Sequence, residues 1–106
     1  MARALTPYEQ RIEDKVRQRL QRSEWNNSIP VIRERILRIL GAAEDWRLKR
    51  PQLTQKLSNL GCTRDERRIE ALRQLETAGV IRRETFQVRE ESVQQGEIWV
   101  LEKPQP

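Results

Sequence analysis

The sequence predicts a mainly α-helical chain with a small β-hairpin near its C-terminus. Four segments between residues 6 and 78 place apolar side chains at intervals of three and four, which is the spacing of amphipathic helices. After residue 84 the period changes, and apolar and polar side chains alternate as they do in strands. The chain has 106 residues, so we expect a single core, because domains cluster at roughly 100–150 residues.

The first helix is expected over residues 6–24. Thr6 is a suitable N-cap, and Pro7 follows at the first helical position, where its missing N–H is not needed. An apolar stripe then repeats every four residues along an otherwise charged helix. The stripe consists of Tyr8, Ile12, Val16 and Leu20. Two interpretations are open: the stripe packs on the rest of its own chain, or it pairs with the same helix of a second copy.

Two further helices are expected before Gly61, separated from the first by a loop at 25–28. The second begins near Ile29 and ends at Gly41. Its buried face consists of Ile32, Ile36, Ile39 and Leu40. Residues 46–49 are long enough for one short strand or an extended link. The third helix spans residues 51–60, and its inward side chains are Leu53, Leu57 and Leu60.

The fourth helix is expected over residues 63–78. Thr63 and Glu66 have the spacing of a capping box, in which each side chain accepts a hydrogen bond from a free backbone N–H at the helix start. The inward side chains are Ile69, Leu72 and Leu75, and Gly79 ends the helix. A rotation of roughly 100° per residue then defines the outward face. That face consists of Thr63, Glu66, Arg67, Glu70, Arg73, Gln74 and Thr77.

The hairpin is expected from residues 85–89 and 97–101. The first segment alternates Phe86 and Val88 with polar residues, and the second is rich in strand-forming side chains. The polar stretch between them ends in Gly96 and forms the tip.

Composition excludes several classes of chemistry. Histidine is absent and Cys62 is the only cysteine, which rules out His-based general bases, Ser-His-Asp and Cys-His nucleophile systems, and an internal disulfide. No apolar run reaches the ~20 residues of a membrane span, and the N-terminus lacks the apolar stretch of a signal peptide. We therefore expect a cytoplasmic protein with no membrane association that is not an enzyme and holds no cofactor or metal.

Charge is distributed unevenly along the chain. The sequence has 21 Lys and Arg against 16 Asp and Glu, a net charge of +5. Residues 84–106 contain two cations and five anions, so residues 1–83 carry a net charge of +8. Most of the cations are arginines, whose planar guanidinium suits phosphates and base edges. A basic body of this kind favours a polyanionic partner, most often a nucleic acid.

Two stretches carry a resemblance to a known family. Leu57-Ser58-Asn59-Leu60-Gly61-Cys62-Thr63 is similar to the turn between the second and third helices of winged helix-turn-helix proteins. The stretch from Leu72 to Ile81 resembles the end of their recognition helix. The resemblance covers Ile29 to Glu102 and implies a three-helix core plus a wing, with an additional N-terminal helix. The expected organisation is an N-terminal helix and linker over 1–28, a winged helix domain over 29–103 and a disordered tail over 104–106.

The resemblance implies sequence-specific binding of double-stranded DNA by the helix 63–78, in a small transcriptional regulator. Added N-terminal helices often form dimers in this superfamily, so Tyr8, Ile12, Val16 and Leu20 are candidate homodimer contacts. Candidate DNA contacts follow from side-chain chemistry, because Arg and Lys bind phosphates while Arg and Gln also recognise base edges. The candidate contacts are Lys56, Thr63, Arg64, Arg67, Arg73, Gln74 and Thr77, with Arg50 as a further phosphate contact. The alternative is a solvated face with a Glu70–Arg73 pair.

Two features depart from the winged-helix pattern. Arg68 stands where many relatives have an apolar residue, so either the first turn of the helix is rotated or Arg68 lies at the core edge with its head in solvent. The wing region 90–97 is acidic, which disfavours contact between its tip and phosphates. This acidity favours an alternative function, a winged-helix adaptor that binds a protein through residues 90–97. RNA binding by the basic body is a third possibility.

Overall fold

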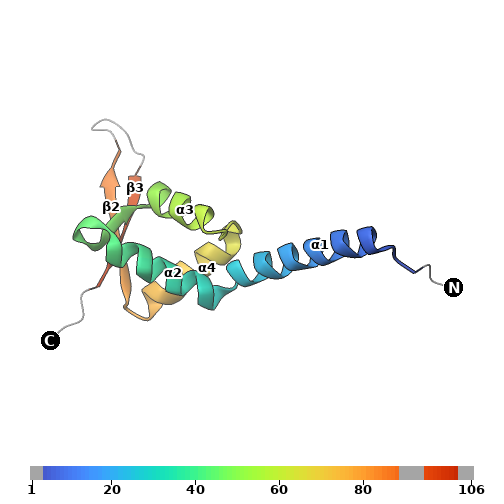
Figure 1. The fold of residues 1–106 in the computed structure, drawn as a ribbon. Helices are drawn as coiled ribbons and strands as arrows, with labels where there is room; N and C mark the ends of the chain where they lie inside the picture. The colour runs from blue at the N-terminus through green and yellow to red at the C-terminus, as the bar shows by residue number, and fades with distance from the viewer. Residues whose placement is uncertain (1–3, 89–94, 103–106) are drawn as a thin grey trace.

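The computed structural model describes residues 4–88 and 95–102 and confirms a mainly helical chain with a small antiparallel sheet (Figure 1). The helices are α1 (Pro7–Asn26), α2 (Ile29–Ala42), α3 (Arg50–Asn59) and α4 (Asp65–Thr77), with a short 3₁₀ turn, η1 (Glu44–Trp46), after α2. The strands are β1 (Arg47–Lys49), β2 (Ile81–Gln87) and β3 (Gln95–Leu101). Of the expected hairpin tip at 90–96, residues 90–94 lie outside the described residues and Gln95 and Gly96 belong to β3, while the tail at 104–106 also lies outside them.

The sheet joins the hairpin to the segment before α3. Its strand order is β1-β3-β2, and both pairs are antiparallel. Trp99 of β3 lies opposite Leu48 of β1 and Arg83 of β2. The segment 47–49 is therefore a strand, which decides between the two possibilities that the sequence left open. β3 begins at Gln95, two residues earlier than expected.

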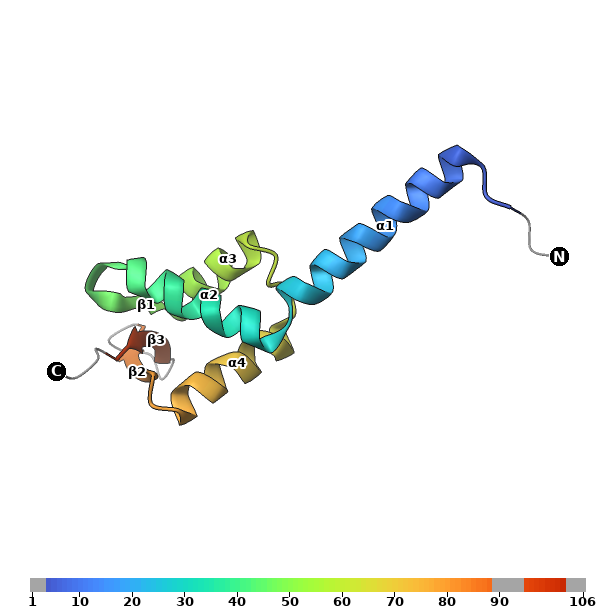
Figure 2. The same ribbon diagram turned by 60° about the horizontal axis from the view of Figure 1, so that its bottom comes forward.

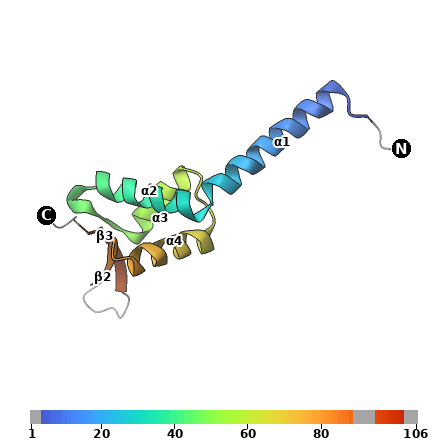
Figure 3. The same cartoon turned by 90° about the horizontal axis from the view of Figure 1, so that it is seen from below.

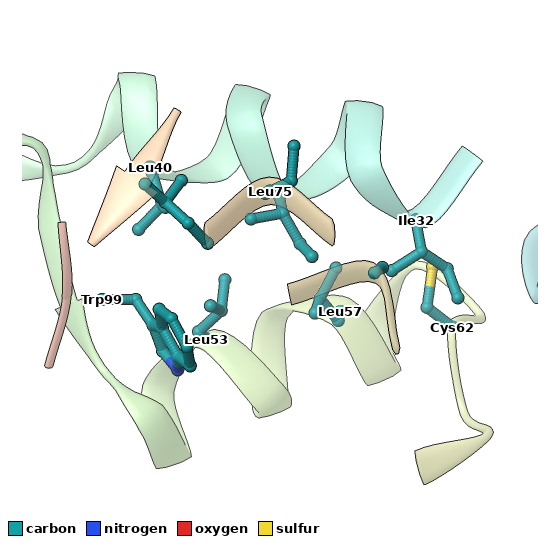
Figure 4. Packing of buried hydrophobic residues seen from close by; sticks show 10 residues of the cluster. Ile32, Leu40, Leu53, Leu57, Cys62, Leu75 and Trp99 are labelled. Carbon is teal, nitrogen blue, oxygen red and sulfur yellow. The ribbon is translucent and has the colours of Figure 1, made fainter. Parts of the chain in front are cut away.

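The core lies between α2, α3, α4 and the inner face of the sheet. Ile32, Ile36 and Leu40 of α2 are completely buried, as the helical spacing predicts. Figure 4 shows how side chains from the other elements meet this row. They include Leu53, Leu57, Cys62, Leu75 and Trp99. Four expected core positions differ: Ile39 and Leu72 are only partly buried, while Leu60 and Ile69 are 47% and 50% exposed.

Helix ends follow the sequence signals at three places. Thr6 accepts a hydrogen bond from the N–H of Glu9 at 3.2 Å, as an N-cap does. After α3, Cys62 donates to the carbonyl of Leu57 and Gly61 to that of Ser58, both at 3.0 Å, and Gly61 has a φ of 89°. This is the Schellman arrangement, which needs a left-handed residue after the helix. Gly79 closes α4 in the same way, with a φ of 75°.

α1 projects away from the rest of the molecule. Figure 2 shows that it leaves the body near the start of α2, and Figure 3 shows the same separation from below. None of its residues is buried, and the apolar stripe is open, with Tyr8 73% and Leu20 62% exposed. The radius of gyration is 19.1 Å, against about 13 Å for a compact chain of this length. The expectation that the stripe packs on its own chain is therefore wrong for the described residues.

Candidate nucleic-acid interface

A side chain at the end of α1 holds the start of α4. Asn27 is 2% exposed, and its Oδ1 accepts hydrogen bonds from the backbone N–H groups of Thr63 and Arg64, both at 2.9 Å. Its Nδ2 donates to the carbonyls of Ser23 at 2.9 Å and Gly61 at 3.3 Å. One buried amide therefore satisfies backbone groups on both sides of the α3–α4 turn and fixes α1 to α4.

The capping box expected at Thr63 and Glu66 is wrong. α4 begins at Asp65 with Arg64 as its N-cap residue, and no side chain of the N-cap bonds the first turn. Asn27 already accepts from the N–H of Thr63 and Arg64, so these donors need no local side chain. The Thr63 side chain is left exposed beside the turn.

Arg68 lies inside the junction between α3 and α4. Its Nη1 donates to the carbonyl of Cys62 at 2.8 Å and to Ser58 Oγ at 3.3 Å, and its Nη2 donates to Asp65 Oδ1 at 2.7 Å. These partners satisfy the hydrogen-bond donors of a residue that is only 9% exposed. The expectation that its head lies in solvent is wrong, and the rotated first turn is correct.

The rotation changes which face of α4 is outward. The buried positions of the helix are Arg68, Ala71 and Leu75, while Leu72 is half-buried. Ile69, which was expected to point inward, is therefore exposed. A face centred opposite the buried row, at roughly 100° per residue, contains Glu66, Ile69, Glu70, Arg73 and Thr77. This face contains Ile69 and lacks Arg67, so it is less basic than the outward face that the sequence predicts.

Three of the predicted DNA contacts lie together at the start of α4. Thr63, Arg64 and Arg67 are exposed within about one helical turn of each other. Among the described residues, no side chain or backbone group pairs with the guanidinium of Arg64 or Arg67. These two cations are therefore available to an external anion, and they stand at the helix N-terminus, where the backbone also favours negative charge.

The middle of α4 carries a hydrogen-bond network instead of free side chains. Arg73 Nε donates to Glu70 Oε2 at 2.9 Å, and Gln74 Nε2 donates to Glu70 Oε1 at 3.1 Å. Arg33 of α2 donates to Gln74 Oε1 at 2.8 Å, which turns the half-buried Gln74 toward α2. The hydrogen bonds from Arg73 and Gln74 lower the pKa of Glu70 to about 2. Two of the predicted base-reading residues are thus engaged within the free protein, and Thr77 is exposed.

A cavity of about 310 Å³ lies between α4, the start of α3 and the hairpin. Its lining brings the predicted contacts Arg50 and Arg73 together with Arg83. The arginines do not present free charge, because Glu97 is 3.7 Å from Arg50 and 3.4 Å from Arg83, and Arg73 pairs with Glu70. The indole N–H of Trp99, which also lines the cavity, is buried without a hydrogen-bond partner among the described residues.

Lys56 is not part of this surface. It lines a second, larger cavity of about 560 Å³ between α2, α3 and the η1 segment, together with Arg38 and Leu60. The structure therefore separates Lys56 from the predicted contacts of α4. Of the acidic region 90–97, only residues 95–97 are described, and Glu97 is engaged with Arg50 and Arg83.

Comparison with known proteins places the chain in no family, because no family model, curated protein or solved structure gave a significant match. Within residues 4–88 and 95–102, no helix has both the length and the apolarity needed to cross a membrane. The same residues contain no group of three or more His, Cys, Asp or Glu side chains placed to hold a metal ion.

Proposed function

We propose that the segment from α2 to β3 is a winged helix that binds double-stranded DNA sequence-specifically, with α4 in the major groove. The observation that carries the proposal is the pair of exposed arginines at the start of α4, Arg64 and Arg67, which have no partner within residues 4–88 and 95–102. The element order supports it, since two helices joined by a glycine turn precede an antiparallel hairpin. A helix has a diameter of roughly 10–12 Å, which matches the width of the major groove.

Each candidate side chain has a distinct task in this proposal. Arg64 and Arg67 bind phosphates and position the helix, which provides affinity without sequence choice. Arg73 and Thr77 lie farther along the outward face and read base edges. Arg73 must exchange its bond to Glu70 for a bond to a base, so Glu70 opposes binding in the free protein. Gln74 remains with Arg33 and contributes to positioning rather than to base contact.

The protein acts as a homodimer in this proposal, through the stripe of Tyr8, Ile12, Val16 and Leu20. The support is exposure: each of these side chains is between 46% and 73% exposed on a helix that touches little else. Apolar patches of this kind usually mark an interaction site. A second copy of the same stripe would form an isologous contact and present two copies of α4 to a symmetric operator.

The proposal is tested by titrating the protein against random-sequence duplex DNA at two salt concentrations, with light scattering on the same sample. We expect micromolar or tighter binding that weakens steeply with salt, and a dimer. The double substitution Arg64→Gln, Arg67→Gln should weaken binding to all sequences. A control, Arg38→Gln, removes an exposed cation that pairs with Glu34 on α2 and should have little effect. If the wild type does not bind duplex DNA at low salt, the proposal is wrong.

One observation favours a second function, a protein-binding adaptor. The outward face of α4 combines half-exposed Ile69 with Glu66 and Glu70, a composition that suits a protein surface better than a phosphate backbone. A protein complex on this face would persist at high salt and would be weakened by Ile69→Asp. A DNA complex would instead be abolished by salt, and competition with structured RNA distinguishes duplex DNA from RNA as the polyanion.

A further inference from the structure

α1 carries a second stripe beside the apolar one. Four cations recur at spacings of four, four and three residues, and they are Arg11, Lys15, Arg19 and Arg22. At roughly 100° per residue they fall within about 80° of one another, on one side of the apolar stripe. Glu9 and Glu13 fall on the opposite side of that stripe. We name the four cations the basic face of α1.

The basic face has no electrostatic partner in the described part of the chain. All four side chains are exposed, and none of them forms an ion pair or hydrogen bond with residues 4–88 or 95–102. The nearest acid on the helix, Asp14, instead accepts a hydrogen bond from Gln10 at 3.1 Å. Four like charges along one side of a helix repel each other, so the basic face does not stabilise the folded monomer.

The arginines of the sheet behave differently. Arg47 and Arg82 both pair with Glu84, and Arg83 pairs with Glu76 and Glu97. Arg47, Arg82 and Arg83 of the sheet are therefore paired with acids, whereas the basic face of α1 and the two arginines at the start of α4 have no acidic partner within the described residues. These two sites are mechanically joined, because Asn27 bonds the turn before α4 directly at the end of α1.

The dimensions of the basic face match a nucleic-acid backbone. From Arg11 to Arg22 a helix advances roughly 16 Å at 1.5 Å per residue. One strand of a duplex presents a phosphate about every 3.4 Å along its axis, so the four cations span about five phosphates. The basic face and the apolar stripe occupy different sectors of the helix, so a dimer formed through the stripe leaves the basic face open to DNA.

We propose that the basic face of α1 binds the phosphate backbone of the same duplex that α4 enters, beyond the segment covered by α4. The inference rests on the proposed function of α4 and extends it: α1 is a second DNA-binding element as well as a dimer contact. Its contribution is electrostatic and independent of sequence, which lengthens the footprint without changing the preferred operator.

The test compares two variants that lose the same charge. The first removes the basic face by R11Q, K15Q, R19Q and R22Q; the second removes four other cations by R17Q, R38Q, R47Q and R82Q. All eight positions are exposed, and glutamine is a good helix former at the six that lie in α1 and α2, so both chains should fold, which circular dichroism checks. Affinity for one random-sequence duplex is measured from 50 to 200 mM salt, and light scattering verifies that the oligomeric state is unchanged.

We expect removal of the basic face to reduce the salt slope of log Kobs by up to about 3.6 per protomer. The wild type should then lose about 100-fold more affinity over this salt range than the variant does. The second variant should keep most of the wild-type slope. Equal losses in both variants would show a net-charge effect and overturn the assignment to α1. An unchanged slope in the first variant would overturn the inference and leave α4 binding intact, whereas a wild type that does not bind DNA overturns both.

Discussion

α1 and the body from α2 to β3 are both rich in charge, but they use it in opposite ways. In the body, arginines of the sheet pair with glutamates and Arg68 is bonded inside the fold, while Arg64 and Arg67 at the start of α4 have no partner among the described residues. In α1, no residue is buried and the cations of the basic face are unpartnered among the described residues. Burial therefore separates two roles of charge in this chain. Arg68, which is buried, holds the junction of α3 and α4, whereas the exposed cations of α1 and of the start of α4 are available to a partner.

The largest difference between the two regions is expected in the loss of stability when an isoleucine is truncated to alanine. Ile36→Ala in α2 should lower the free energy of unfolding by about 2–5 kcal/mol, because the side chain is completely buried. Ile12→Ala in α1 should change it by less than about 1 kcal/mol at concentrations where the protein is monomeric, because Ile12 is already exposed. Urea denaturation measures both. A large loss in the Ile12 variant under those conditions would mean that α1 packs on the body.

The second-largest effect on stability is expected at Asn27, which joins α1 to the body. Asn27→Ala removes the acceptor for the N–H groups of Thr63 and Arg64 and the donor to Gly61, and it should cost about 3 kcal/mol of unfolding free energy. Asn59→Ala is the control, since Asn59 is exposed and bonds only Gln55 nearby. If denaturation finds equal stability for the two variants, Asn27 does not fix α1 to α4.

Sequence patterns predicted the elements whose signals are local. The helix period of Ile32, Ile36 and Leu40 and the glycine stops at 61 and 79 all correspond to what the structure shows. The capping box failed because its competitor, Asn27, is 36 residues distant from Thr63 along the chain, beyond any local pattern. The charge spacing of α1 was visible in the sequence, but only the structure shows that these side chains lack partners within the described residues.

Arg68 and Ile69 show the limit of a periodicity argument. Apolar residues define the inward face in such an argument, so it predicts that Ile69 points inward and leaves two possibilities for Arg68, a rotated first turn or a place at the core edge. The carbonyl of Cys62 and the hydroxyl of Ser58 accept hydrogen bonds from the guanidinium of Arg68. Arg68 is therefore buried and Ile69 is exposed. The candidate DNA contacts shift with it: Gln74 turns toward Arg33 and Ile69 takes an outward position.

The third effect compares the two left-handed glycines. Gly79→Ala should cost about 1 kcal/mol for its positive φ alone, because nothing lies within 4 Å of the new methyl group. Gly61→Ala should cost more, because its methyl would lie 2.6 Å from Nδ2 of Asn26 at the end of α1. Thermal or urea unfolding ranks the two variants. Equal costs would show that the end of α1 moves aside freely, which would weaken the idea of a rigid joint.

The smallest effect concerns Glu70, the one acid in the described part of the chain whose pKa is strongly lowered. Because that pKa is about 2 in the folded protein, below its ordinary value of 4.5, ionised Glu70 stabilises the fold above pH 4.5, and this contribution disappears as the pH falls through 2. Glu70→Gln should therefore lower the melting temperature slightly at pH 7 and leave it unchanged near pH 2. The pair is exposed, so the shift should be small.

The same substitution sharpens the functional contrast between the regions. Glu70→Gln releases Arg73 and removes an anion from the outward face of α4, so it should tighten DNA binding a few-fold at pH 7. Glu66→Gln is the matched control, because it removes an equal charge from the same face without releasing Arg73. A larger gain in DNA affinity for Glu70→Gln than for Glu66→Gln would identify Arg73 as a DNA contact that Glu70 engages in the free protein. Unchanged DNA binding in both variants would mean that this face of α4 does not contact DNA.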